Sequence, residues 1–176
     1  MCGITGVLHF DRSRSIDKHK LKSMTDIIEH RGPDGEGFFI DNNVGFGHRR
    51  LSIIDLSTGD QPMYSDDGNK ILVFNGEIYN YVELRDELSK IGYSFKTNSD
   101  TEVILKSYEE WGFDCQNKFN GMWSFAIWDK LKQELFLSRD RIGEKPLHYS
   151  VYENSLIFGS EMKSLFVYGV PKVPDY

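Results

Sequence analysis

The pattern of hydrophobic and polar positions divides the chain into three parts, and the first part is typical of strands around one helix. Residues 3–10 form a short apolar run with β-branched side chains, which predicts a buried strand. Residues 17–30 carry apolar side chains at helical spacing and precede a loop rich in helix breakers, which predicts a helix. Residues 37–41 and 44–51 flank a pair of asparagines and predict a hairpin.

The second part contains two helical patterns. They begin at Asn80 and Ser99, and in each a glutamate follows three positions later, as in a capping box. Apolar residues then recur at helical spacing until a glycine ends each pattern. Before these helices, residues 70–74 predict a strand that ends at Asn75 and Gly76, a pair that on its own is typical of a turn.

The third part returns to strand-like runs. These runs follow Gly121, are separated by polar turns, and predict a second set of antiparallel strands. Residues 161–168 predict a last short helix, and the proline-containing residues 169–176 predict a linker or tail. Strands, central helices and strands again indicate a layered α+β architecture and not a βαβ repeat. We expect residues 2–168 to form one domain.

Composition and charge restrict the class of function. Apolar residues make up 39% and aromatic residues 14% of the chain, which favours a packed core over disorder. The net charge of −6 and the lack of a dense Lys/Arg run argue against a nucleic-acid surface. No stretch approaches the about 18 apolar residues of a membrane-spanning helix, and the start lacks a signal-peptide pattern. We therefore expect a soluble cytoplasmic protein with small-molecule or protein partners, without nucleic acid or membrane.

The two cysteines differ in their expected roles. Neither belongs to a zinc-spaced cluster, and the histidines form no metal-binding pattern, so no metal or other cofactor is expected. Cys115 is expected to be a small buried hydrophobic residue. Cys2 follows Met1 and precedes a glycine, so removal of Met1 would give it a free α-amine. With ordinary pKa values of about 7.7–8.0 for the amine and about 8.5 for the thiol, the amine can serve as the base for the thiol.

Eight motifs occur in order along nearly the whole chain: MCGITGV, HRGPDGEG, GHRRLSIIDLSTGDQP, FNGEIYNYVELR, SDTEVIL, FNGMWSFAIWD, RDRIGEKPLHY and FGSEMKSL. Together they resemble the class II glutamine amidotransferases, and within that family the glutaminase domain of asparagine synthetase. The resemblance implies an N-terminal nucleophile hydrolase fold, a four-layer αββα sandwich with two antiparallel sheets. It also implies hydrolysis of glutamine to glutamate and ammonia, with Cys2 as the nucleophile.

The same resemblance assigns residues to the two ends of the glutamine substrate. Arg50 is expected to hold the α-carboxylate through paired charge-assisted hydrogen bonds, with Arg49 as the alternative. The backbone from Leu51 to Ile53 is implied as a further wall of the pocket. Glu77 is implied as one of two acids that receive the α-ammonium group.

The second of these acids is Asp100, whose charge could also serve the N-terminus of the helix that begins there. Asn75 and Gly76 are implied as the oxyanion hole, with the Asn75 side-chain amide and the Gly76 N–H as donors. The alternative for this pair is the simple Asn-Gly turn noted above.

In the family, the ammonia passes to an ATP-dependent synthetase domain or subunit that makes asparagine. The chain contains no GxxxxGK[ST] loop, so we expect the synthetase half and its ATP site to be absent from it. Two alternatives stay open: a glutaminase that serves another acceptor, such as a sugar acid, a hexosamine or a purine precursor, and a glutamine-binding regulatory module without turnover. The oligomeric state also stays open and includes a homodimer. No chemical role is assigned to Arg31, Asp34, Arg141 and Lys145.

Overall fold

The computed structural model describes residues 1–51 and 59–173. The chain forms two compact units. We call residues 1–51 with 146–176 the terminal unit, and residues 52–145 the central unit.

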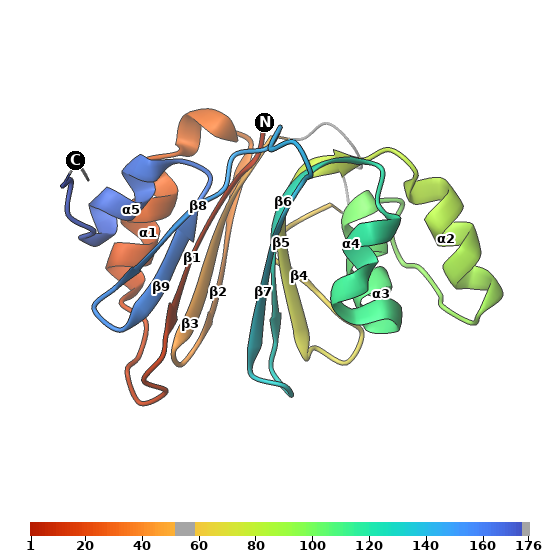
Figure 1. Cartoon of the computed structure of the whole chain (residues 1–176), viewed down its shortest axis with the longest axis horizontal. Coiled ribbons are helices and arrows are strands. Elements are labelled where there is room, and N and C mark those ends of the chain that lie inside the picture. The colour runs from red at the N-terminus through yellow and green to blue at the C-terminus, as the bar shows by residue number, and fades with distance from the viewer. Residues whose placement is uncertain (52–58, 174–176) are drawn as a thin grey trace. The chain divides into compact units, whose positions relative to one another are not determined.

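The terminal unit is built on an antiparallel sheet of five strands in the order β2-β3-β1-β9-β8. Its first strand in the sequence, β1, lies in the middle of the sheet, where it pairs with β3 on one side and β9 on the other (Figure 1). The strand bounds are Gly3–His9 for β1, Gly35–Asp41 for β2, Val44–Arg50 for β3, His148–Tyr152 for β8 and Ser155–Gly159 for β9.

Helices α1 (Lys18–Asp26) and α5 (Met162–Tyr168) contact each other and pack on this sheet (Figure 1). The Asp17 side chain accepts hydrogen bonds from two backbone N–H groups of α1 and so caps its N-terminus. The 3-10 turn Glu29–Arg31 follows α1 and leads into β2. A core cluster between helices and sheet takes apolar side chains from β1, β9, α1, α5 and the segment before α1: Val7, Ile16, Leu21, Met24, Ile157, Leu165 and Tyr168.

The central unit has a four-stranded antiparallel sheet in the order β4-β5-β6-β7. Most of α3 is buried, and α3 contacts β5 and α2. The strand bounds are Met63–Tyr64 for β4, Lys70–Ile78 for β5, Gly121–Asp129 for β6 and Glu134–Arg139 for β7. The helix bounds are Tyr81–Lys90 for α2, Asp100–Trp111 for α3 and Cys115–Lys118 for α4, with a 3-10 turn at Gly112–Asp114.

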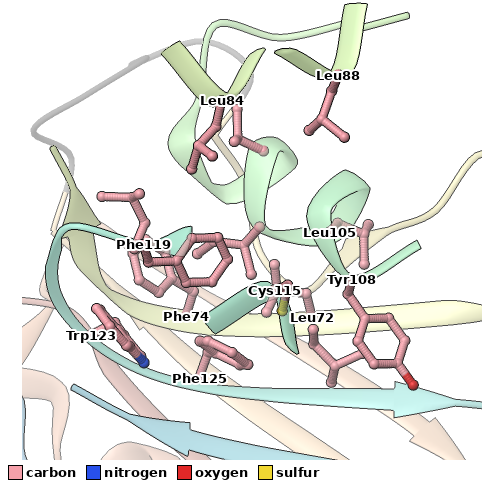
Figure 2. Close-up of a cluster of buried hydrophobic side chains, with 14 residues drawn as sticks. Leu72, Phe74, Leu84, Leu88, Leu105, Tyr108, Cys115, Phe119, Trp123 and Phe125 are labelled. Carbon is pink, nitrogen blue, oxygen red and sulfur yellow. The ribbon is translucent and has the colours of Figure 1, made fainter. Parts of the chain in front are cut away.

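The core of the central unit is a cluster of side chains from sheet and helices, which Figure 2 shows in close-up. Leu72, Phe74 and Phe125 come from the sheet, and Leu105 comes from α3. Cys115 is fully buried in this cluster, so its predicted role as a small hydrophobic residue is confirmed. Both cysteines are free.

The structure corrects three details of the sequence interpretation. The later strands do not form one second set: β6 and β7 join β5, whereas β8 and β9 return to the sheet of β1. Strand β5 continues through Asn75 and Gly76 to Ile78, so the turn interpretation of this pair is wrong. The Asn80 side chain does not cap α2, because it instead contacts the backbone at Lys118 and Asn120.

Within the described residues, no helix combines the length and the apolar character needed to cross a membrane.

Candidate active site

Cys2 lies directly before β1 in the terminal unit, as predicted, and is half-buried. The Leu51 N–H donates to the Cys2 Sγ at 3.3 Å, and the Sγ donates to the Leu51 carbonyl oxygen at 3.6 Å. The Cys2 carbonyl oxygen accepts a hydrogen bond from Arg31 Nε at 3.0 Å. Both the thiol and the carbonyl of the proposed nucleophile therefore have partners, while the preceding Met1 is 54% exposed.

Arg31 is a residue whose contact with Cys2 the sequence interpretation missed. Its side chain is only 9% exposed, and Gly3 leaves space for it. A Cβ at Gly3 would lie 2.8 Å from Ile28 Cδ1 and 3.3 Å from Arg31 Cδ. The sequence shows only that Arg31 lies beside a sharp turn near the end of an apolar helix. Nothing in it identifies the hydrogen-bond acceptor, Cys2, which lies 29 positions away.

Arg49 and Arg50, the two candidates for the carboxylate ligand, are adjacent at the end of β3. The Arg49 guanidinium contacts Asp26 Oδ1 at 2.5 Å and Glu36 Oε2 at 3.1 Å, so it is engaged within its own unit. Successive residues of a strand point to opposite faces, so Arg50 projects from the other face of the sheet. Leu51 contacts Cys2 as described, and Ile53 lies outside the described residues.

In the central unit, one edge of β5 faces away from β6, and among the described residues only the first part of this edge pairs with another strand. The short strand β4 pairs only with Ile71 and Leu72. Further along the same edge, the Phe74 N–H donates to Gln61 Oε1 at 2.6 Å, and the Ile78 N–H donates to Asp100 Oδ2 at 3.0 Å. Backbone N–H groups two residues apart point to the same edge of a strand.

The N–H of Gly76, midway between Phe74 and Ile78, therefore points to the same edge. Gly76 has no room for a side chain, because a Cβ would lie 2.2 Å from the Met122 carbonyl oxygen and 2.8 Å from Trp123 Cα. A glycine is thus required here by the close approach of β6.

Asn75 is buried, and its side-chain nitrogen has no hydrogen-bond partner among the described residues. Leaving a buried donor unpaired typically costs about 1–3 kcal/mol, so such groups are rare in native proteins. An unpaired amide nitrogen next to an outward-pointing backbone N–H is the arrangement that an oxyanion hole requires.

Asp100 begins α3 and is 4% exposed. Burial raises the pKa of its carboxyl above the ordinary value, the negative charge of Glu77 raises it further, and hydrogen bonds from the N–H groups of Ile78 and Thr101 oppose the shift. The two acids are therefore close enough to interact electrically. Ser99 caps α3 by accepting from the Thr101 N–H, so the Asp100 carboxylate is left to contact β5.

The structure thus brings the predicted residues together in two groups. Cys2, Arg50 and Leu51 belong to the terminal unit, whereas the other described candidates belong to the central unit: Asn75, Gly76, Glu77 and Asp100. Among the described residues, no group of three or more His, Cys, Asp or Glu side chains is arranged to hold a metal ion.

Comparisons with known proteins identify relatives along the whole chain. The glutamine amidotransferase domain family matches residues 1–175. Asparagine synthetase [glutamine-hydrolyzing] 2 of Bacillus subtilis is 50% identical over 168 residues, covering 94% of this chain and 22% of that protein. Asparagine synthetase [glutamine-hydrolyzing] 1 of the same organism is 47% identical over 169 residues, covering 95% and 27%. The chain therefore spans about a quarter of the length of these relatives.

A solved structure confirms the fold class. Glutamine phosphoribosylpyrophosphate amidotransferase from B. subtilis, solved with ADP and GMP, superposes with a TM-score of 0.79 at 20% identity. The match covers 96% of this chain and 44% of that one. The α+β fold of the N-terminal nucleophile hydrolases, with two antiparallel sheets, is therefore confirmed. The chain belongs to the glutamine amidotransferase domain family.

Proposed function

We propose that this chain hydrolyses the side-chain amide of glutamine to glutamate and ammonia, with Cys2 as the nucleophile. The observation that carries this proposal is the buried side-chain nitrogen of Asn75, which has no hydrogen-bond partner within residues 1–51 and 59–173, beside the Gly76 N–H at the edge of β5 that faces away from β6. A folded protein retains such an unpaired donor at a stability cost, which is explained if the donor serves a developing negative charge.

The reaction begins when the α-amine of Cys2, freed by removal of Met1, accepts the thiol proton. The sulfur then attacks the amide carbon, and Asn75 and Gly76 donate hydrogen bonds to the oxyanion. Ammonia leaves, a glutamyl thioester forms on the sulfur, and water activated by the same amine hydrolyses it.

The two ends of the substrate are bound by opposite charges. Arg50 holds the α-carboxylate through paired charge-assisted hydrogen bonds, and Arg49 pairs with Asp26 and Glu36. Asp100 and Glu77 receive the α-ammonium. Their mutual repulsion and the burial of Asp100 favour a cation between them.

Replacement of the nucleophile tests this proposal directly. In the protein with Met1 removed, Cys2→Ala should lower glutamate release from glutamine by at least about 1,000-fold, because the covalent step is lost. The matched control is Cys115→Ala, which removes the other thiol from a site in the core of the central unit. Unchanged turnover in Cys2→Ala would refute the proposal. The form that retains Met1, identified by N-terminal mass, should also be inactive, because its Cys2 nitrogen is an amide.

We also propose that the ammonia serves asparagine synthesis in an ATP-dependent synthetase domain or subunit. The support is the identity to two asparagine synthetases of which this chain matches about a quarter. On this proposal residues 2–168 form the glutaminase domain, and residues 169–176 form a linker, since α5 ends at Tyr168. A cytoplasmic location and a homodimer stay predictions. Glutamine binding without turnover after Met1 removal would instead identify a regulatory module.

A further inference from the structure

The Arg31 guanidinium has a second contact besides Cys2. Arg31 Nη1 lies 3.1 Å from Glu161 Oε1, while Nε donates to the Cys2 carbonyl oxygen at 3.0 Å. The remaining nitrogen, Nη2, is buried without a hydrogen-bond partner among the described residues. The carboxylate of Glu161 is therefore the charged partner that orients this nearly buried guanidinium.

Glu161 is itself held in its ionised state. Its carboxylate also lies 2.9 Å from His30 Nε2 and 3.1 Å from Lys163 Nζ. Although burial disfavours the charge, hydrogen bonds from Arg31, Lys163 and His30 lower the pKa of Glu161 to about 2. The carboxylate is thus charged at every pH at which a thiol nucleophile operates.

Ser160, the residue before Glu161, holds the start of β1 close to Cys2. Ser160 is fully buried; its hydroxyl accepts from the Ile4 N–H at 2.9 Å, and its own N–H donates to the Ile4 carbonyl oxygen at 2.9 Å. The ladder between β1 and β9 begins one step further on, at Thr5 and Gly159. Consecutive residues of one segment thus hold Ile4 directly and Cys2 through Arg31.

We propose that Glu161 is a positioning residue for Cys2: it fixes the Arg31 guanidinium, and Arg31 fixes the Cys2 carbonyl group. This inference rests on the proposed function of Cys2. Once Met1 is removed, Cys2 is the terminal residue, and rotation about the Gly3 N–Cα bond swings the Cys2–Gly3 peptide group and all of Cys2 relative to β1. Holding the carbonyl oxygen restrains this peptide group and so fixes the position from which the amine and the thiol project. Because Glu161 touches neither substrate nor thiol, its effect is on orientation alone.

The test uses Glu161→Gln and Glu161→Ala in the protein with Met1 removed. Gln retains an oxygen acceptor but loses the charge, whereas Ala loses both. We expect kcat to fall about threefold in the first and about thirtyfold in the second, because misplacement of a reacting group by 1 Å can cost about 100-fold. KM for glutamine should stay within about twofold, since the residues that bind the substrate ends are unchanged.

Alkylation of the thiol by iodoacetamide provides a readout that does not depend on the oxyanion hole. It reports on Cys2, because burial raises the pKa of the Cys115 thiol to about 12 and protects it. We expect the alkylation rate to fall in parallel with kcat. A wild-type alkylation rate and wild-type kcat in Glu161→Ala would overturn the inference, and so would a change in KM alone.

Two controls separate orientation from stability. Glu153→Gln makes the same chemical change at a mostly exposed ion pair of the same unit, where Glu153 lies 3.9 Å from Arg14, and should leave kcat unchanged. Glu153→Gln should melt within about 3 °C of the parent, since an exposed ion pair stabilises little. The Glu161 variants leave a nearly buried guanidinium without its charged partner and should melt lower, so kcat and alkylation are measured well below their melting temperatures. In an Arg31→Met background, Glu161→Gln should cause no further loss of kcat; an equal loss in both backgrounds would refute the relay through Arg31.

The failure of this inference is distinguishable from failure of the proposed function. Inactive Cys2→Ala with fully active Glu161→Ala would refute the role of Glu161 alone, whereas active Cys2→Ala would refute the nucleophile itself.

Discussion

Strands β1 and β5 each carry or adjoin residues proposed for the reaction, but the polar groups of the two strands differ in their hydrogen bonding. At β1, the thiol and carbonyl of Cys2 have partners in Leu51 and Arg31. At β5, the Asn75 side-chain nitrogen is buried without a partner among the described residues, and the Gly76 N–H points to the edge that faces away from β6. The proposed nucleophile is thus held by hydrogen bonds, whereas the side-chain nitrogen of the proposed oxyanion donor Asn75 has none within residues 1–51 and 59–173.

Because of this difference, substitutions at the two strands should affect stability and catalytic activity in different proportions. Satisfied hydrogen bonds around Cys2 stabilise the fold and orient the nucleophile together, so changes there should affect both properties. Unpaired donors on β5 destabilise the fold until a substrate oxygen arrives, so their removal should lower activity and spare stability.

The largest effect is expected for Asn75→Leu, which replaces the unpaired amide by an apolar group of similar shape. Loss of one oxyanion donor should lower kcat about 100–1,000-fold. The free energy of unfolding should stay equal or rise by about 1 kcal/mol, because a buried unpaired donor is removed. Steady-state kinetics and denaturant unfolding measure the two quantities.

Ser124→Ala is the matched control for Asn75→Leu. Ser124 lies opposite Asn75 on β6, is fully buried, and its hydroxyl also lacks a partner among the described residues. Since no role in the reaction is proposed for it, turnover should stay within about twofold. A large loss of stability in Asn75→Leu would contradict the comparison between the two strands.

A second test compares neighbouring arginines of the terminal unit. Arg50→Met should raise KM for glutamine about 10–100-fold, because hydrogen bonds between charged groups are lost from the substrate carboxylate. Arg49→Met should instead lower the free energy of unfolding by about 1 kcal/mol with little change in KM, because Arg49 contacts Asp26 and Glu36. The reverse pattern would assign the carboxylate to Arg49.

The smallest effect is expected when the pH dependence of the free energy of unfolding is compared between the parent protein and Asp100→Asn. Burial raises the pKa of Asp100 above its ordinary value of 3.8, so the folded state disfavours the ionised form. The parent should therefore gain stability relative to the variant as pH falls through the raised pKa, and the gain should be complete below 3.8.

Substrate binding by Asp100 should show the opposite trend. The α-ammonium of glutamine requires the ionised carboxylate, so KM of the parent should rise as pH falls over the same range. Unfolding curves and KM values measured at several pH values in both proteins test this pair of trends. If KM of the parent does not rise in the pH range where the parent gains stability, the ionised form of Asp100 is not needed for binding.

The sequence predicted most elements because their signals are local. The apolar run of β1, the helical spacing of α3 and the turn between β2 and β3 each depend on a few neighbouring residues. The sequence did not predict that β8 and β9 return to β1, because strand partners are chosen by burial across long separations and leave no local signal.

The candidate site was predictable to a different extent. The candidate site residues, such as Cys2 and Asn75, were proposed from the motifs. The residues that hold them were not: Arg31 and Glu161 reach Cys2 through side-chain contacts over long separations in sequence. From the sequence alone, Asn75 and Gly76 could also be interpreted as a turn. The pairing with β6 that makes them part of a strand involves residues far away in the sequence.

The central position of β1 in its sheet has a consequence for the newly made chain. One flank of β1 is completed only by β9, which begins at Ser155. At the usual rate of about 5–20 residues per second, β1 waits about 10–30 s on the ribosome for this partner. If Met1 is removed as the proposed function requires, its removal during this interval would precede the completion of the sheet around β1 by β9.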